Sequence, residues 1–97
     1  MEANQGSPKR FIFFYLMKDL PEVIGSVVIA HIEYWKQCTL NHYLGGPFAD
    51  RSGGMITFAC DEIKRAEEII AGDPFVTSDL LAQQWIKEWN IPLILKQ

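Results

Sequence analysis

The chain has 97 residues, of which 48% are hydrophobic and 22% charged, and its formal net charge is −3. This length supports one small domain, and an acidic chain without a basic run beyond Lys9-Arg10 is a poor partner for nucleic acid. No apolar run is long enough to span a bilayer, so we expect no membrane partner. The polar first ten residues do not resemble a secretion signal, which predicts a cytoplasmic protein. Cys38 and Cys60 fit no metal spacing and are expected as free thiols, with a single disulfide left open.

The first third of the chain predicts a strand and a long helix. Residues 1–9 are polar, which predicts a flexible tail. Residues 11–17 form a continuous aromatic and apolar run, which is typical of a central strand covered on both faces. Pro21 is suited to start a helix, and apolar residues recur at helical spacing from residue 27 to residue 41.

The middle of the chain predicts a hairpin. Residues 43–48 form a short strand interrupted by Gly-Gly-Pro, and residues 49–54 supply the turn. Residues 55–60 form a second buried strand, which completes the hairpin.

The last third predicts a second helix and a final strand. Asp61 is suited to cap the helix at its start, and Gly72 to end it in a left-handed conformation. Asp73-Pro74-Phe75 follows as a stiff loop. Large residues alternate over residues 83–93, which predicts the last strand.

The resulting order β-α-β-β-α-β predicts an α+β fold of the ferredoxin-like type, formed by residues 10–97 as a single domain. Its sheet is expected to be antiparallel, with both helices on one face. The strands at residues 11–17 and 55–58, together with Trp85 and Trp89, supply more apolar surface than two helices can cover. We therefore expect a homodimer in which two sheet faces pack together.

Four features in this order resemble the YciI-like (YCII-related) family of dimeric α+β barrel proteins. They are the aromatic first strand, His31 in the first helix, Gly45-Gly46-Pro47-Phe48 in the hairpin, and Asp73-Pro74-Phe75 after the second helix. The resemblance covers nearly the whole chain after the tail. It implies a fold similar to that of muconolactone isomerases, in a family that includes a dehydrochlorinase of a chlorinated hydroxyquinol. It also implies a His-Asp pair in a pocket near the end of the sheet. Members often carry an arginine or other polar residue just before the helix histidine, where this chain has Val28-Ile29-Ala30.

His31 and Asp73 are the candidate catalytic residues. An imidazole can take or give a proton near neutral pH, and a carboxylate can hold one ring nitrogen and fix its tautomer. Pro74 favours an extended backbone at Asp73 and stiffens the loop. The residues alone leave two alternatives open: His31 as a core histidine bonded to a backbone carbonyl, and Asp73 as a turn residue bonded to its own backbone.

Further residues are candidate substrate contacts. Tyrosines beside the helix histidine and near the end of the first strand are placed to wall an aromatic pocket. The Gly-Pro step of the hairpin lets a ligand approach the backbone closely. Core packing, or a bend in an edge strand, is the alternative for each. The candidates are Tyr15, Tyr34, Gly46, Pro47 and Phe75.

These assignments predict proton-transfer chemistry on a small molecule. The chain has no glycine-rich phosphate loop and no Gly-x-Ser-x-Gly elbow, which disfavours ATP chemistry, dinucleotide binding and serine hydrolysis. A metal site built on His31 and His42 lacks a third ligand. We expect an enzyme of the isomerase, lyase or dehydrochlorinase type, without cofactor or metal, acting on a small cyclic or aromatic metabolite. The alternative is a non-catalytic ligand-binding or interaction module on the same dimeric barrel. A haem-degrading or monooxygenase relative would need a ligating cluster that the matched positions do not show.

Overall fold

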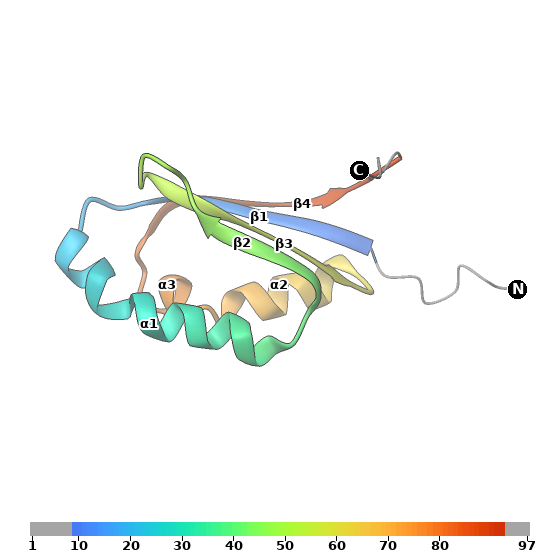
Figure 1. Ribbon diagram of the computed structural model, residues 1–97, viewed down its shortest axis with the longest axis horizontal. Helices are drawn as coiled ribbons and strands as arrows, with labels where there is room; N and C mark the ends of the chain where they lie inside the picture. The colour runs from blue at the N-terminus through green and yellow to red at the C-terminus, as the bar shows by residue number, and fades with distance from the viewer. Residues whose placement is uncertain (1–8, 93–97) are drawn as a thin grey trace, which may run out of the picture.

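The computed structural model describes residues 9–92. The chain folds into a four-stranded antiparallel sheet with helices on one face (Figure 1). The strand order in space is β2-β3-β1-β4. The expected α+β fold of the ferredoxin-like type is therefore confirmed. The elements in chain order are β1 (Lys9–Met17), α1 (Pro21–Cys38), β2 (Asn41–Pro47), β3 (Gly53–Cys60), α2 (Ile63–Ala71), α3 (Pro74–Thr77) and β4 (Leu81–Trp89).

Strand β1 lies at the centre of the sheet and carries apolar side chains on both faces. Phe11, Phe13 and Tyr15 belong to the core under the helices and are at most 4% exposed. Ile12 and Phe14 alternate with them and are half-buried on the opposite face. The cover that the apolar run predicts on both faces is therefore complete only on the helix side, because the outward side chains of β1 stay half-buried.

The ends of several predicted segments shift in the structure, including the last strand, which spans Leu81–Trp89 and not residues 83–93. Of the expected tail, residues 1–8 lie outside the described part of the chain, and Lys9 is already the first residue of β1, paired with Cys60. Helix α1 ends at Cys38 and not at residue 41, because Thr39 adopts a left-handed backbone with φ 49° and ψ 47°. Within residues 9–92, no helix is both long enough and apolar enough to cross a membrane.

Helix α2 differs from the sequence expectation at both ends. Its N-cap is Glu62 and not Asp61, and no side chain caps it. Gly72 has φ −88° and ψ −7°, so the expected left-handed ending is wrong. A glycine is needed there for another reason: a Cβ would collide with the hydroxyl of Tyr34, which donates to the carbonyl of Ile69.

The expected loop at Asp73-Pro74-Phe75 is in fact the start of a short helix, α3. Asp73 is its N-cap, with an extended backbone and a side chain that accepts the N–H of Phe75 at 2.9 Å. Pro74 occupies the first helical turn, where a missing N–H leaves no bond unmade. The cap bond thereby fixes the carboxylate relative to the start of α3.

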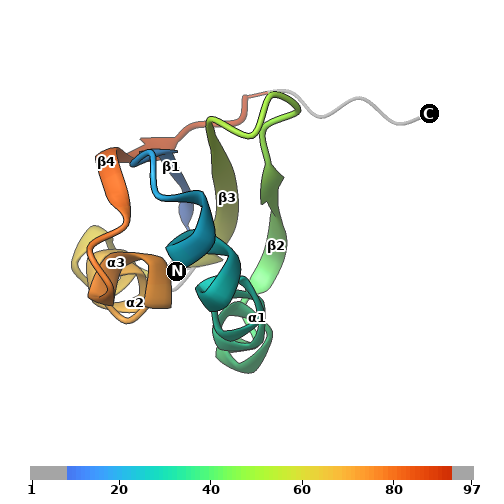
Figure 2. The ribbon, with the colours of Figure 1, turned by 90° about the vertical axis from the view of Figure 1, so that its left-hand side faces the viewer.

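The second face of the sheet is uncovered. Figure 2 shows the helices together on one side of the sheet and no element of the described chain on the other. Phe14 on this face stacks on Trp85, with ring centroids 4.9 Å apart. Trp85, Met55 and Trp89 are each about two-fifths exposed, at 38%, 42% and 43%. These large apolar side chains lie on the outer surface of the sheet, with Lys87 between the two tryptophans on β4, and we call this surface the open face.

Candidate functional site

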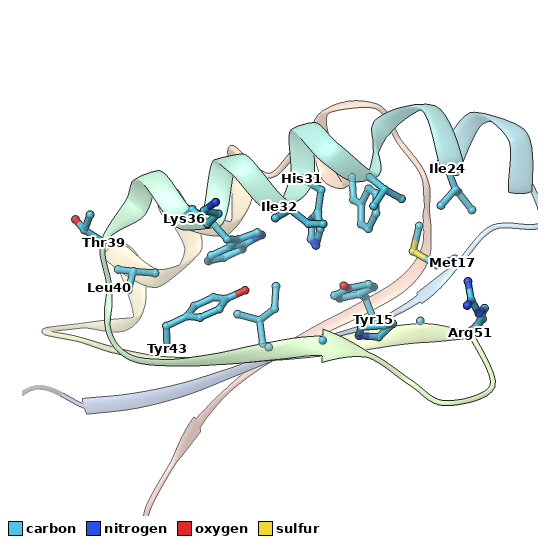
Figure 3. Close-up of a pocket in the computed structure, with 18 residues that line it drawn as sticks. Tyr15, Met17, Ile24, His31, Ile32, Lys36, Thr39, Leu40, Tyr43 and Arg51 are labelled. Carbon is cyan, nitrogen blue, oxygen red and sulfur yellow. The ribbon is translucent and has the colours of Figure 1, made fainter.

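A cavity of about 670 Å³ lies between α1 and the sheet (Figure 3). Helix α1 covers it on one side, and β1, β2, β3 and the β2–β3 loop line the other. Its volume falls within the range of about 300–1,000 Å³ that is usual for small-molecule sites. Most of its lining is apolar, with a small number of polar groups, which is the usual pattern of a small-ligand pocket.

His31 projects from the middle of α1 into this cavity (Figure 3). Its Nδ1 lies 2.8 Å from Oδ1 of Asp73, and its side chain is 13% exposed. The imidazole stacks on the ring of Phe75, with centroids 3.9 Å apart and planes only 8° from parallel. The hydrogen bond fixes the direction of the ring, and the stack fixes its plane.

Asp73 is completely buried behind this histidine and accepts three hydrogen bonds. Oδ1 accepts from His31 and from the backbone N–H of Phe75, while Oδ2 accepts from Nε1 of Trp35 at 3.0 Å. A carboxylate oxygen only accepts, so we assign the proton of the imidazole to Nδ1. Nε2 then keeps a lone pair that is free to take a proton.

Trp35 has a hydrogen-bonding role that the sequence reasoning missed. Its place one turn from His31 is compatible with a wall of the pocket or, more simply, with core packing, and the residue is buried and lines the cavity. Its indole N–H nevertheless holds the second oxygen of Asp73. Trp35 follows His31 by four residues and therefore shares its helix face, which is the signal that could have linked the two residues.

Two tyrosine hydroxyls line the cavity, those of Tyr15 and Tyr43. Burial, reinforced by the charge of Asp73 and by Tyr43, raises the pKa of Tyr15 far above its usual range. Burial likewise raises the pKa of Tyr43, with Asp73 and Cys38 adding to the effect. Both side chains are therefore neutral hydroxyls at working pH, able to donate a hydrogen bond to a ligand oxygen.

Tyr34 does not line the cavity, although we expected it to contact substrate. Its hydroxyl turns away and donates to the carbonyl of Ile69 in α2. Burial is the main cause that raises the pKa of Tyr34 to about 12. Tyr34 thus connects the two long helices and supports the site from outside.

The remaining expected contacts do line the cavity. Gly46 and Pro47 contribute to the β2 wall, and Phe75 lies beneath the histidine ring. The neighbouring Gly45 leaves room for the hydroxyl of Tyr43, whose Oη would lie 2.8 Å from a Cβ at that position. The Gly-Gly-Pro segment therefore shapes the cavity as well as the edge of the sheet.

The cavity also contains two cations that the sequence reasoning did not single out. Lys36 comes from α1 and Arg51 from the loop between β2 and β3. No aspartate or glutamate is among the described residues that line the cavity. Whether an arginine in this loop reaches the cavity depends on the geometry of the hairpin, and the sequence pattern does not predict that geometry.

Cys38 and Cys60 are free and half-buried. Burial is the main cause that raises the pKa of both thiols, so they are protonated at neutral pH and weak nucleophiles. Among residues 9–92, no group of three or more His, Cys, Asp or Glu side chains could hold a metal ion.

The fold and the cavity define a small α+β protein with a histidine–aspartate pair beside a ligand-sized space. Residues 12–90 match the family model of the YCII-related domain, and the chain belongs to this family. No curated protein matches the chain in sequence.

A solved structure gives the same fold. It is 5-chloro-2-hydroxyhydroquinone dehydrochlorinase from Burkholderia phenoliruptrix in complex with 2,5-dihydroxybenzoquinone, with a TM-score of 0.72. The two chains are 17% identical, and the similarity covers 84% of this chain and 93% of that one. At this level of identity, the likeness concerns the fold.

Proposed function

We propose that this protein is a cofactor-independent enzyme that moves a proton on a small cyclic or aromatic metabolite. The observation that carries the proposal is the imidazole of His31, which faces a cavity of about 670 Å³ while a fully buried carboxylate holds its Nδ1 at 2.8 Å. An imidazole held in this way is suited to general acid–base catalysis.

The chemistry follows from the roles of the three polar groups. Nε2 of His31 takes a proton from a substrate carbon, and Asp73 stabilises the resulting imidazolium through its bond to Nδ1. The hydroxyl of Tyr15 is placed to donate to a substrate oxygen, where negative charge develops. The electron pair of the broken C–H bond then forms a double bond, and either a leaving group departs or the proton returns at another carbon.

The reaction class is therefore elimination or isomerisation. The structural neighbour is named a dehydrochlorinase, and its structure holds a dihydroxylated six-membered ring. This name supports an elimination, and that ring is a suitable first probe for the cavity of this protein.

The test measures proton transfer directly and needs no knowledge of the natural substrate. In D₂O, ¹H NMR follows the exchange of the ring C–H hydrogens of 2,5-dihydroxybenzoquinone. We expect the protein to accelerate this exchange, and His31→Gln to reduce the acceleration by about 10²–10⁴-fold, the usual contribution of a positioned acid–base group. His42→Asn is the matched control, because His42 is exposed in β2 and does not line the cavity.

The alternative function has a distinct outcome in the same experiment. If the ring binds but the wild-type exchange rate equals that of His31→Gln, the protein is a ligand-binding module and the catalytic proposal is wrong. Asp73→Asn is expected to slow the exchange as well, because an amide can donate to Nδ1 and so favour the wrong tautomer.

We further propose that two copies pair through their open faces. The face exposes Met55 and Trp85 on either side of Phe14, and Trp89 further along β4, and soluble monomers seldom leave such large apolar groups together in contact with water. Sheet-to-sheet packing of two copies would bury this surface under a two-fold axis.

A further inference from the structure

We propose that the substrate carries a carboxylate, and that Arg51 binds this group while His31 acts on the ring. The inference rests on the proposed function, because it assigns the substrate class of the same cavity. Three observations support it: the charges around the cavity, the position of the arginine, and the apolar surface between the arginine and the histidine.

The charges around the cavity favour an anion. Its described lining contains two cations and no carboxylate. Lys36 already has a partner, because its Nζ lies 3.7 Å from Glu33 Oε2, and its side chain is 69% exposed. Arg51 forms no ion pair with any residue in the described part of the chain.

The carboxylate next to Arg51 in sequence does not neutralise it. Asp50 is engaged by the turn itself, where its Oδ1 accepts from the backbone N–H of Ser52 at 2.9 Å and from the Ser52 hydroxyl at 2.6 Å. The guanidinium is thus the cation of the cavity that lacks a counter-charge among the described residues, and an anionic ligand would supply one.

The hairpin holds Arg51 at one end of the cavity. Its backbone N–H donates to the carbonyl of Phe48 at 2.9 Å, and its φ of 65° is a left-handed value that is uncommon for an arginine. Figure 3 shows the side chain near Met17 and Ile24, at the end of the cavity opposite Leu40 and Tyr43. His31 lies between these two ends.

This arrangement orients a ligand with one charged end. A ligand ring next to His31 can rest on the apolar lining of the cavity, and a carboxylate attached to this ring can extend toward the hairpin. Arginine presents a planar fork of donors that pairs with both oxygens of a carboxylate. Arg51 is itself exposed, so its pairing with a carboxylate depends on two-point hydrogen bonding and not on exclusion of water.

The test compares charged probes with neutral ones of the same shape. Benzoate, phenylacetate and 3-phenylpropionate are titrated against benzamide, phenylacetamide and 3-phenylpropionamide, with binding followed by protein NMR shifts. Three chain lengths are used because the best span between ring and carboxylate is measured in the same series. We expect at least one carboxylate to bind about tenfold more tightly than its amide, as a bidentate charge-assisted pair allows.

Variants identify the cation responsible. Arg51→Gln is expected to abolish the preference for the carboxylate, and Arg51→Lys to retain part of it. Arg65→Gln is the matched control, because Arg65 lies on α2 outside the cavity and pairs with Glu68. Lys36→Gln tests the second cation of the cavity, and loss of the preference in this variant but not in Arg51→Gln would overturn the assignment to Arg51.

Equal binding of carboxylates and amides by the wild-type protein would overturn the inference. A preference that survives in Arg51→Gln, or no binding of any carboxylate at millimolar concentration, would overturn it as well.

These failures are separable from failure of the proposed function. If His31-dependent deuterium exchange persists without a carboxylate preference, only the substrate class is wrong. If the preference is present but exchange is absent, Arg51 recognises an anion in a protein that does not catalyse.

Discussion

At the scale of single residues, the site depends on the hydrogen bonds that Asp73 accepts. Its carboxylate is fully buried, and its donors are Trp35, His31 and the backbone of Phe75. Burying a carboxylate is unfavourable unless such donors replace water. Each donor therefore stabilises the fold and holds the acceptor of the imidazole in place.

Replacing Trp35 by Phe tests this arrangement. The substitution keeps an aromatic ring but removes the indole N–H that Oδ2 of Asp73 accepts. We expect the free energy of unfolding to fall by about 1–3 kcal/mol, because a buried acceptor loses its partner. We also expect a slower His31-dependent exchange. Urea denaturation and the deuterium assay measure the two effects.

Trp85→Phe is the control for this substitution. Trp85 lies on the open face, and no hydrogen bond of its indole is found among residues 9–92. Equal losses of stability in the two variants would show that the indole N–H of Trp35 contributes nothing.

Sequence reasoning reached some of these residues and not others. His31 and Asp73 could be selected because their chemistry is distinctive and because both lie in segments that resemble those of the YciI-like family. The donor role of Trp35 was missed, since a buried tryptophan in an apolar helix face is usually core. Arg51 was missed because its position depends on how the hairpin turns in space.

At the scale of elements, one contact couples the two long helices. The hydroxyl of Tyr34 in α1 reaches the carbonyl of Ile69 near the end of α2 and passes over Gly72. This contact sets the distance between the helices, and α2 leads directly to the cap that carries Asp73.

Gly72→Ala is expected to destabilise the protein by about 1–3 kcal/mol, because the new methyl group would overlap the Tyr34 hydroxyl. Gly25→Ala should do the opposite. Gly25 lies within α1 with open space where a Cβ would project, and alanine there should add about 0.5–1 kcal/mol of helix stability. Thermal and urea unfolding compare the two variants.

The double variant Tyr34→Phe/Gly72→Ala identifies the cause. Removing the hydroxyl should relieve much of the clash, so the two substitutions should not be additive. Additive losses of stability would mean that Gly72 is required for a reason unrelated to Tyr34.

The type and order of the elements were predictable because each has a clear period or a continuous apolar run. Their ends were less predictable. Asp61 looked like an N-cap from its residue type, yet the helix starts one residue later and uses no side-chain cap. Helix α3 was missed because a run of four residues has too little periodicity to be recognised.

At the scale of the whole molecule, the sheet has one face under the helices and one that no part of the described chain covers. The open face carries large apolar groups from at least two strands, including Met55 and Trp85. A 97-residue chain gains much by burying such a surface, because its own core is limited in size.

Trp85→Glu is expected to shift the proposed dimer toward monomer, since two like charges and their desolvation would oppose the contact between faces. Light scattering coupled to size-exclusion chromatography measures the mass. Ile29→Glu is the matched control, because Ile29 is 75% exposed on α1, away from the sheet. A wild-type protein that is monomeric at all accessible concentrations would contradict the dimer.

Asp73 has both a structural role and a proposed catalytic role, and this combination affects how such a site changes over evolution. The same carboxylate starts α3 and satisfies a buried indole, so the chain depends on it even without any chemistry. The imidazole supplies only one of the three hydrogen bonds to this carboxylate, in addition to its stack on Phe75, so fewer contacts of the fold depend on it. In a lineage that loses catalytic activity, selection for folding would preserve the aspartate after the histidine had been substituted. The histidine, and not the aspartate, is therefore the better marker of retained activity among diverged descendants.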